Sequence, residues 1–176
     1  DIKFSIDEVM IGREKPERKM SKNELERVSK REAGHALMSY VLKNCEPPVK
    51  VSILPRGEAA LGFSQQKPDD KKLYTQYYVL SQICVLLGGR SAEKIFYQEL
   101  SSGAHDDIEK VTQLMEHYYK NWGMSKKYGP LNFNNLKIKQ DSKITKSIIS
   151  AVKKLEKFTI EVLTSNKEQV EKLANK

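Results

Sequence analysis

The feature that most constrains the fold is a long amphipathic helix pattern that begins after Ser21. Ser21 and Glu24 have the spacing of a capping box, in which the hydroxyl and the carboxylate each accept a hydrogen bond from an unpaired backbone N–H group. Apolar residues then recur with helical spacing until Pro47 and Pro48 end the pattern. The sequence therefore predicts a helix over residues 22–43 with one face buried against other elements.

A small sheet and further helices are expected after this first helix. Apolar and polar residues alternate over residues 49–54, and a second short strand is expected over residues 60–65. Three more helical patterns follow, over residues 75–99, 105–121 and 142–175, the last with a break near residue 165. Inside the first of these, Gly88 and Gly89 imply either a close approach of another backbone or a break. The expected fold class is α+β, mainly α with one small β-sheet.

Composition excludes several classes of protein. A chain of 176 residues with 39% hydrophobic and 31% charged residues is typical of one globular domain. No apolar run approaches the roughly 18 residues that a membrane span needs, so the chain itself is expected to be soluble. Its two cysteines, Cys45 and Cys84, form no CxxC pair, which argues against a zinc ribbon or a thioredoxin-type site and favours a reducing compartment.

Positive charge is concentrated near the C-terminus. The formal net charge is +8, and residues 134–176 contain ten lysines and five acidic residues. We favour a lysine-rich, solvated helix face, because no aromatic residues alternate with the lysines and no nucleic-acid-binding motif is present. The alternative is a basic helical module that binds nucleic acid or anionic lipid, which would show a steep salt dependence of binding.

The segment REAGH at residues 31–35 carries the candidate chemistry. Glu32 and His35 share one helix face with Arg31, and Gly34 costs up to about 1 kcal/mol relative to Ala, so a close approach is expected there. The segment is the HExxH pattern of zinc peptidases with Arg31 in place of the first His. In the intact pattern two His bind zinc and the Glu polarises the metal-bound water. By itself, a Glu and a His at this spacing are typical of an ordinary helix surface.

Several further motifs, which follow one another in a fixed order and spacing, make a functional role for Glu32 and His35 more credible than the spacing alone does. They are REAGHAL at 31–37, VSILPRG at 51–57, ALGFSQ at 60–65, LLGGRSAEKIF at 86–96, SSGAHDDIEKVTQ at 101–113 and WGMSKKYGPLNF at 122–133. Through them the chain resembles the peptidase domain of FtsH-like membrane-bound AAA+ metalloproteases, most closely the mitochondrial m-AAA branch. The resemblance covers about residues 8–133, and the C-terminal part matches in pattern only.

The resemblance implies a role for individual residues. Glu32 corresponds to the general base, and His35 and Asp107 correspond to two zinc ligands of the family. The edge of the small sheet would bind an extended polypeptide substrate through Val51, Ser52, Ile53, Leu61 and Gly62. Addition of a strand engages the substrate backbone, so such an enzyme accepts many sequences.

The resemblance also implies a larger subunit. Residues 1–20 are expected to be the remnant of an ATPase lid, residues 21–133 the peptidase domain, and residues 134–176 a loop and C-terminal helical segment of the same domain. The family forms hexameric rings, homo- or hetero-oligomeric, that act on unfolded or membrane polypeptides in membrane protein quality control. The mitochondrial inner membrane is the expected location, with a plastid membrane as the alternative. ATP would bind only the ATPase domain, which is not in this chain, and no nucleic acid is expected.

Arg31 is the departure from the family. A guanidinium stays protonated and has no acceptor atom, so it cannot coordinate zinc. It also repels a dication, since two unit charges about 4 Å apart interact by about 4 kcal/mol at an effective dielectric of roughly 20. Zinc is therefore expected to be absent or weakly bound, with Arg31 in the metal position paired with Asp107, Glu32 or both. His105 and His117 are not expected to replace the missing ligand.

Three functions remain open at this point. The first is a catalytically inactive or crippled peptidase-like domain, either a natural pseudoprotease subunit or the result of an introduced substitution. The second is an active zinc endopeptidase with an unusual ligand set. The third is the basic helical binding module. We favour them in that order, because the first follows directly from the chemistry of Arg31.

Overall fold

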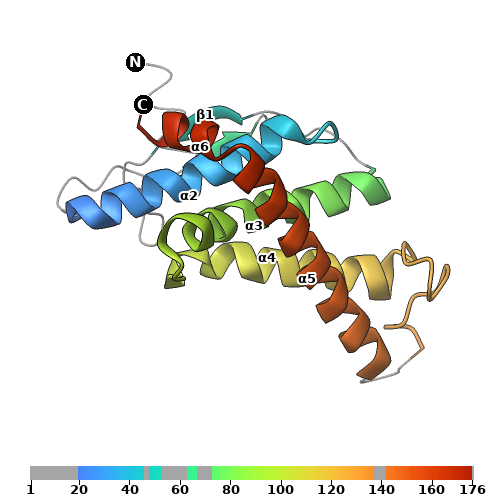
Figure 1. Ribbon diagram of the computed structural model, residues 1–176. Coiled ribbons are helices and arrows are strands. Elements are labelled where there is room, and N and C mark those ends of the chain that lie inside the picture. The colour runs from blue at the N-terminus through green and yellow to red at the C-terminus, as the bar shows by residue number, and fades with distance from the viewer. Residues whose placement is uncertain (1–19, 46–47, 53–62, 67–72, 137–141, 176) are drawn as a thin grey trace, which may run out of the picture.

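The computed structural model describes residues 20–45, 48–52, 63–66, 73–136 and 142–175, so the expected lid remnant lies almost wholly outside the described part (Figure 1). The predicted, mainly helical fold is confirmed. In chain order the elements are α2 (Lys22–Val41), β1 (Pro48–Ser52), β2 (Phe63–Gln66), α3 (Gln76–Tyr97), η1 (Ser102–Ala104), α4 (His105–Glu116), η2 (His117–Asn121), α5 (Ser142–Ser165) and α6 (Lys167–Ala174).

Helix α2 begins as the sequence predicts. The Ser21 Oγ accepts a hydrogen bond from the Glu24 backbone N–H at 3.3 Å, and the Glu24 carboxylate accepts one from the Ser21 backbone N–H at 2.9 Å. Both unpaired donors at the helix start are thus satisfied, and the predicted capping box is confirmed. The helix ends at Val41, two residues before the expected end at residue 43.

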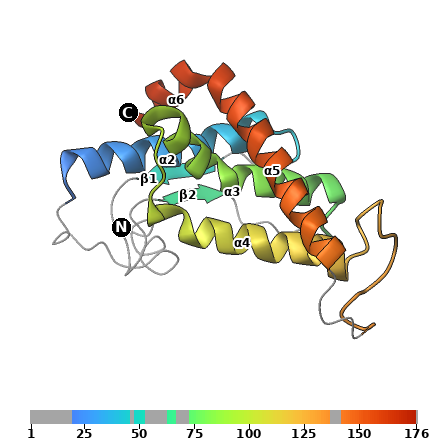
Figure 2. The ribbon, with the colours of Figure 1, turned by 60° about the horizontal axis from the view of Figure 1, so that its bottom comes forward.

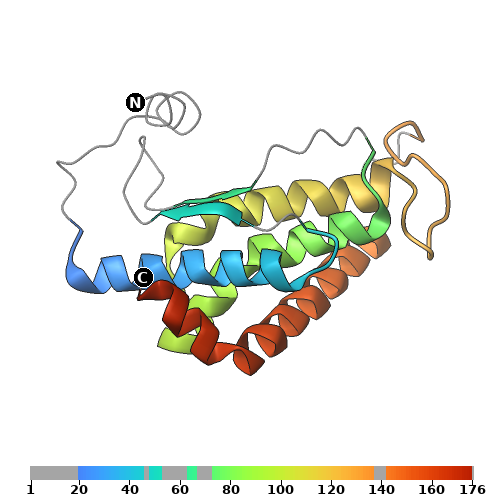
Figure 3. The same ribbon diagram turned by 90° about the horizontal axis from the view of Figure 1, so that it is seen from above.

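Helix α3 passes through Gly88 and Gly89 without interruption, so the break considered for this pair is wrong and the close approach is correct. A Cβ atom on Gly34 would lie 2.6 Å from the carbonyl oxygen of Gly88, and a Cβ atom on Gly88 would lie 2.8 Å from that of Gly34. Helices α2 and α3 therefore cross backbone to backbone at two glycines (Figure 3). This crossing brings the REAGH segment directly against α3.

The two strands form an antiparallel sheet beside α2. Val51 pairs with Ser64 and Ser52 with Phe63, and the register is irregular between Pro48 and Lys50. Strands were expected over residues 49–54 and 60–65, and the stretch between β1 and β2 lies outside the described residues. Figures 2 and 3 both place the sheet on the side of α2 where α4 lies.

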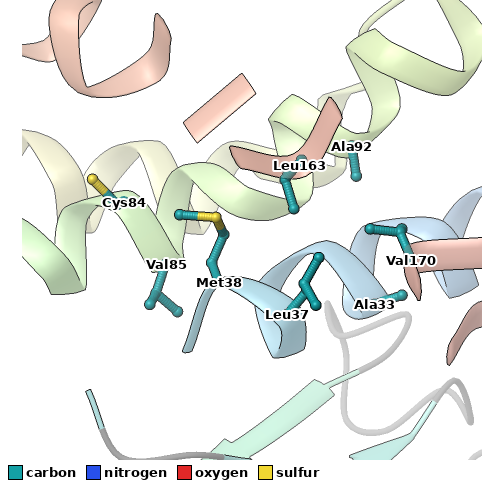
Figure 4. Packing of buried hydrophobic residues seen from close by; sticks show 8 residues of the cluster. All are labelled: Ala33, Leu37, Met38, Cys84, Val85, Ala92, Leu163 and Val170. Carbon is teal, nitrogen blue, oxygen red and sulfur yellow. The ribbon is translucent and has the colours of Figure 1, made fainter. Parts of the chain in front are cut away.

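The C-terminal helices complete the hydrophobic core. As predicted, the last helical pattern is broken, with α5 ending at Ser165 and α6 beginning at Lys167. Residues from both helices are buried against α2 and α3 (Figure 4): the cluster is Ala33, Leu37, Met38, Cys84, Val85, Ala92, Leu163 and Val170. A second cluster joins α3 to α4 through Val79, Ile83, Leu87, Val111, Met115 and Tyr118.

The lysines of α5 point away from this core. Lys146, Lys153, Lys154 and Lys157 are exposed and surround Ile149 and Ser150 on one face of the helix. This exposure fits the solvated face that the composition favours. Among the described helices, none has the length and apolarity that a bilayer span demands.

Candidate functional site

Four ionisable side chains from two distant segments meet where α2 crosses α3. Arg31, Glu32 and His35 come from α2, and Asp107 comes from the first turn of α4. The His35 Nε2 lies 3.3 Å from the Asp107 Oδ2, and the Arg31 Nη2 lies 3.3 Å from the Glu32 Oε1. Side-chain exposure is 12% for Arg31, 3% for Glu32, 9% for His35 and 18% for Asp107, so the cluster is largely removed from water. The structure thus brings together the residues expected at the centre.

The His35 ring is held in one orientation by α3. Its Nδ1 lies 2.8 Å from the backbone carbonyl oxygen of Val85. Because a carbonyl only accepts hydrogen bonds, Nδ1 carries a proton and Nε2 is left to face Asp107. A neutral ring would then direct a lone pair at a carboxylate, so a positive charge is needed between the two atoms, supplied by a second ring proton or by a cation.

The surrounding charges and burial shift the pKa values of all three titrating side chains at this site. Burial alone would lower the pKa of His35, but the hydrogen bond and negative charge of Asp107, with the charge of Glu32 and the Val85 carbonyl, raise it above its ordinary value. Burial would raise the pKa of Asp107, yet the contact with His35 and the charge of Arg31 hold it below its ordinary value. Burial raises the pKa of Glu32, although the charges of His35 and Arg31 oppose that shift.

Arg31 contacts a different carboxylate from that of His35. Its Nη1 donates to the carbonyl oxygen of Gly103 and its Nη2 lies beside Glu32, while Asp107 faces His35. The sequence predicted that Arg31 would pair with Asp107, Glu32 or both, and of these two carboxylates only Glu32 is in direct contact with Arg31. Two glycines make room for the Arg31 side chain. A Cβ atom on Gly89 would lie 2.6 Å from the aliphatic Cγ of Arg31, and a Cβ atom on Gly103 would lie 2.5 Å from its guanidinium Nη1.

The residues present do not fit a catalytic zinc ion. Such an ion takes three protein ligands, and two ligand atoms of one tetrahedral zinc stand roughly 3.3 Å apart, which the His35 and Asp107 atoms satisfy. A third donor is missing, since among the described residues no group of three or more His, Cys, Asp or Glu is placed to hold a metal ion. The guanidinium of Arg31 lies beside Glu32, its positive charge also acts on Asp107, and it offers only N–H donors.

The other histidines do not complete the set. The His117 ring stacks on Trp122 with centroids 5.0 Å apart, and its Nδ1 lies 2.7 Å from the Asn121 side-chain nitrogen. His105 is exposed at the start of α4. Neither belongs to a metal-binding group in the described part of the chain.

The expected substrate-binding strand is described only in part. Val51 and Ser52 lie on β1 and pair with β2. Ile53, Leu61 and Gly62 lie outside the described residues, so the structure does not test the substrate-binding role.

Sequence reasoning missed the groups that hold the site in place. The carbonyl oxygens of Val85 and Gly103 fix His35 and Arg31, and a buried carboxylate, Glu93, holds the turn that precedes α4 through Ser101. Every residue has a backbone carbonyl, so the first two carry no sequence signal. Only the glycines, Gly34 in α2 and the pair in α3, indicated that something approaches this face.

Comparison with known proteins shows the family of this chain. The model for peptidase family M41 matches residues 18–176. The mitochondrial ATP-dependent zinc metalloprotease FTSH 8 of Oryza sativa subsp. japonica is 39% identical over 97% of this chain, and the mitochondrial inner membrane m-AAA protease component YTA10 of Saccharomyces cerevisiae is 37% identical over 97%. The ATP-dependent zinc metalloprotease FtsH of Syntrophobacter fumaroxidans is 42% identical over 76%. This chain covers 22%, 24% and 21% of those proteins, so it spans less than a quarter of their length.

Proposed function

The chain belongs to peptidase family M41, and from that premise we propose that it is the peptidase-type domain of an ATP-dependent metalloprotease subunit whose own zinc site does not work. One observation carries this proposal: among the described residues no third metal donor stands beside His35 and Asp107, and the guanidinium of Arg31 instead contacts the Gly103 carbonyl and Glu32. Glu32 is then an idle general base, because there is no metal-bound water for it to polarise. His35 and Asp107 are what remains of the ligand set.

The same family membership supports a proposal for the domain boundaries, the assembly and the location of the full-length subunit. Residues 21–133 form the peptidase domain, residues 134–176 belong to it, and an ATPase lid would precede them. The subunit would sit in a homo- or hetero-oligomeric ring at the mitochondrial inner membrane, since YTA10 carries that location in its name and FTSH 8 is named as mitochondrial. It would contribute ring contacts and bind passing polypeptide along β1, through Val51 and Ser52, while neighbouring subunits with intact sites cut.

Zinc analysis of the purified, dialysed chain tests the proposal. We expect no stoichiometric zinc in the unaltered chain, and we expect Arg31→His to bind stoichiometric zinc because it supplies the third donor beside two donors already in place. Arg27→His is the matched control: Arg27 lies one turn earlier on α2 and pairs with Glu99 at 3.0 Å, so a His there adds no ligand to the site.

Three results would count against the proposal. Stoichiometric zinc retained by the unaltered chain would contradict it, as would chelator-sensitive cleavage of casein by that chain; both would favour an active endopeptidase with an unusual ligand set. Failure of Arg31→His to gain zinc would show that the site is disabled by more than one residue, contrary to the role given to Arg31.

A further inference from the structure

A buried carboxylate that the zinc chemistry does not involve lies one helical turn from the site. Glu93 on α3 is 2% exposed, and both of its oxygens are used. Its Oε2 accepts the Ser101 backbone N–H at 2.8 Å, and its Oε1 accepts the Ser101 hydroxyl at 2.7 Å. Two hydrogen bonds from one residue to both oxygens of one buried carboxyl group tie the turn after α3 to the helix.

The hydrogen bonds continue from this contact to Arg31. The Ser101 Oγ also accepts the Gly103 backbone N–H at 3.2 Å, and the Gly103 carbonyl accepts the Arg31 guanidinium. An unbroken series of hydrogen bonds therefore runs from Glu93 on α3, through the turn that becomes η1, to α2. Each member places the next, because Ser101 is held from both its backbone and its hydroxyl.

The same turn sets the position of Asp107. Helix α4 begins at His105 directly after η1, and Ala104, the last residue of η1, is 1% exposed. A shift of residues 101–103 would therefore move the first turn of α4 and with it the carboxylate that faces His35. Gly89, which leaves room for Arg31, lies four residues before Glu93 and on the same face of α3.

We propose that Glu93 and Ser101 form a latch that positions the segment 101–107 against α2 and α3, and thereby sets both the Arg31–Gly103 and the His35–Asp107 contacts. Both are positioning residues, since neither contacts the candidate ligands. The latch does not depend on whether the chain cleaves polypeptides. Of the two experiments below, only the measurement of zinc affinity rests on the proposed function.

Hydrogen exchange in the full chain tests the latch directly. Glu93→Gln replaces one acceptor by an amide donor, and Ser101→Ala removes the hydroxyl while the Ser101 backbone N–H keeps its partner. We expect exchange at the amides of residues 101–107 to accelerate about 10- to 100-fold in the first variant and by less in the second, with no change in α5. Glu156→Gln is the control: this carboxylate on α5 pairs with Arg90 at 3.4 Å, so its loss should leave residues 101–107 unchanged.

A measurement of zinc affinity distinguishes a loss of the position of Asp107 from a general loss of stability of the fold. In the Arg31→His background, Glu93→Gln should weaken zinc binding at least about tenfold, because Asp107 is no longer held in register, and Glu156→Gln should not. Unchanged exchange at residues 101–107 in both latch variants would overturn the proposal, as would unchanged zinc affinity. If Arg31→His binds no zinc, the role proposed for Arg31 fails and exchange alone decides the latch; if Glu93→Gln does not fold, Ser101→Ala decides it.

Discussion

Gly34→Ala tests whether the backbone contact between α2 and α3 holds the site together. In an isolated helix this change would stabilise by about 1 kcal/mol. In this protein the new Cβ atom would lie 2.6 Å from the Gly88 carbonyl oxygen and 2.8 Å from the Ala92 Cβ. Ordinary contacts of a Cβ atom begin near 3.4 Å. The helices therefore have to separate by a substantial fraction of an ångström, because main-chain atoms cannot rotate out of the way.

The two effects oppose each other, and the clash is the larger. Overpacking of a core costs about 1–3 kcal/mol, and contact with backbone places this site in the upper part of that range. After subtraction of about 1 kcal/mol for helix propensity, we expect Gly34→Ala to lower the free energy of unfolding by about 1–2 kcal/mol. For a chain of this size, that corresponds to a fall in Tm of roughly 2–8 °C.

Urea unfolding followed by circular dichroism measures this loss. Gly88→Ala approaches the same contact from α3 and should also destabilise, since its Cβ atom would lie 2.8 Å from the Gly34 carbonyl oxygen. Asn23→Ala, on the exposed first turn of α2, should change the stability by no more than about 0.5 kcal/mol. A Gly34→Ala variant as stable as the parent, or more stable, would refute the backbone contact as described.

Three further outcomes follow from the site and the core. EDTA should leave the Tm of the unaltered chain where it is, whereas it should lower the Tm of zinc-loaded Arg31→His; a fall in the unaltered chain would contradict the metal-free site. Leu163→Ala should cost about 2–5 kcal/mol by urea unfolding, because Leu163 is 1% exposed in the core, and a loss below about 1 kcal/mol would show that α5 packs loosely. Burial raises the pKa of the Cys84 thiol, so iodoacetamide should modify the half-buried Cys45 first; equal rates would contradict that burial.

Local chemistry explains why the elements could be placed from the sequence. The capping box at Ser21 acts within a few residues, so its effect does not depend on the rest of the fold. The same holds for the break between α5 and α6. The glycine pair in α3 was ambiguous, because a glycine that ends a helix and a glycine that admits a neighbouring backbone look alike until the neighbour, Gly34, is in place.

The sequence by itself determined what residue 31 can do chemically, since a guanidinium has no lone pair to give a metal in any fold. It also determined the helices that carry Glu32, His35 and Asp107. Only the tertiary structure decided which carboxylate Arg31 and His35 each meet, and that Glu93 holds the turn between α3 and α4. The physical reason is distance along the chain: these contacts depend on how closely two glycines let α2 and α3 approach, and on backbone carbonyls that every residue shares.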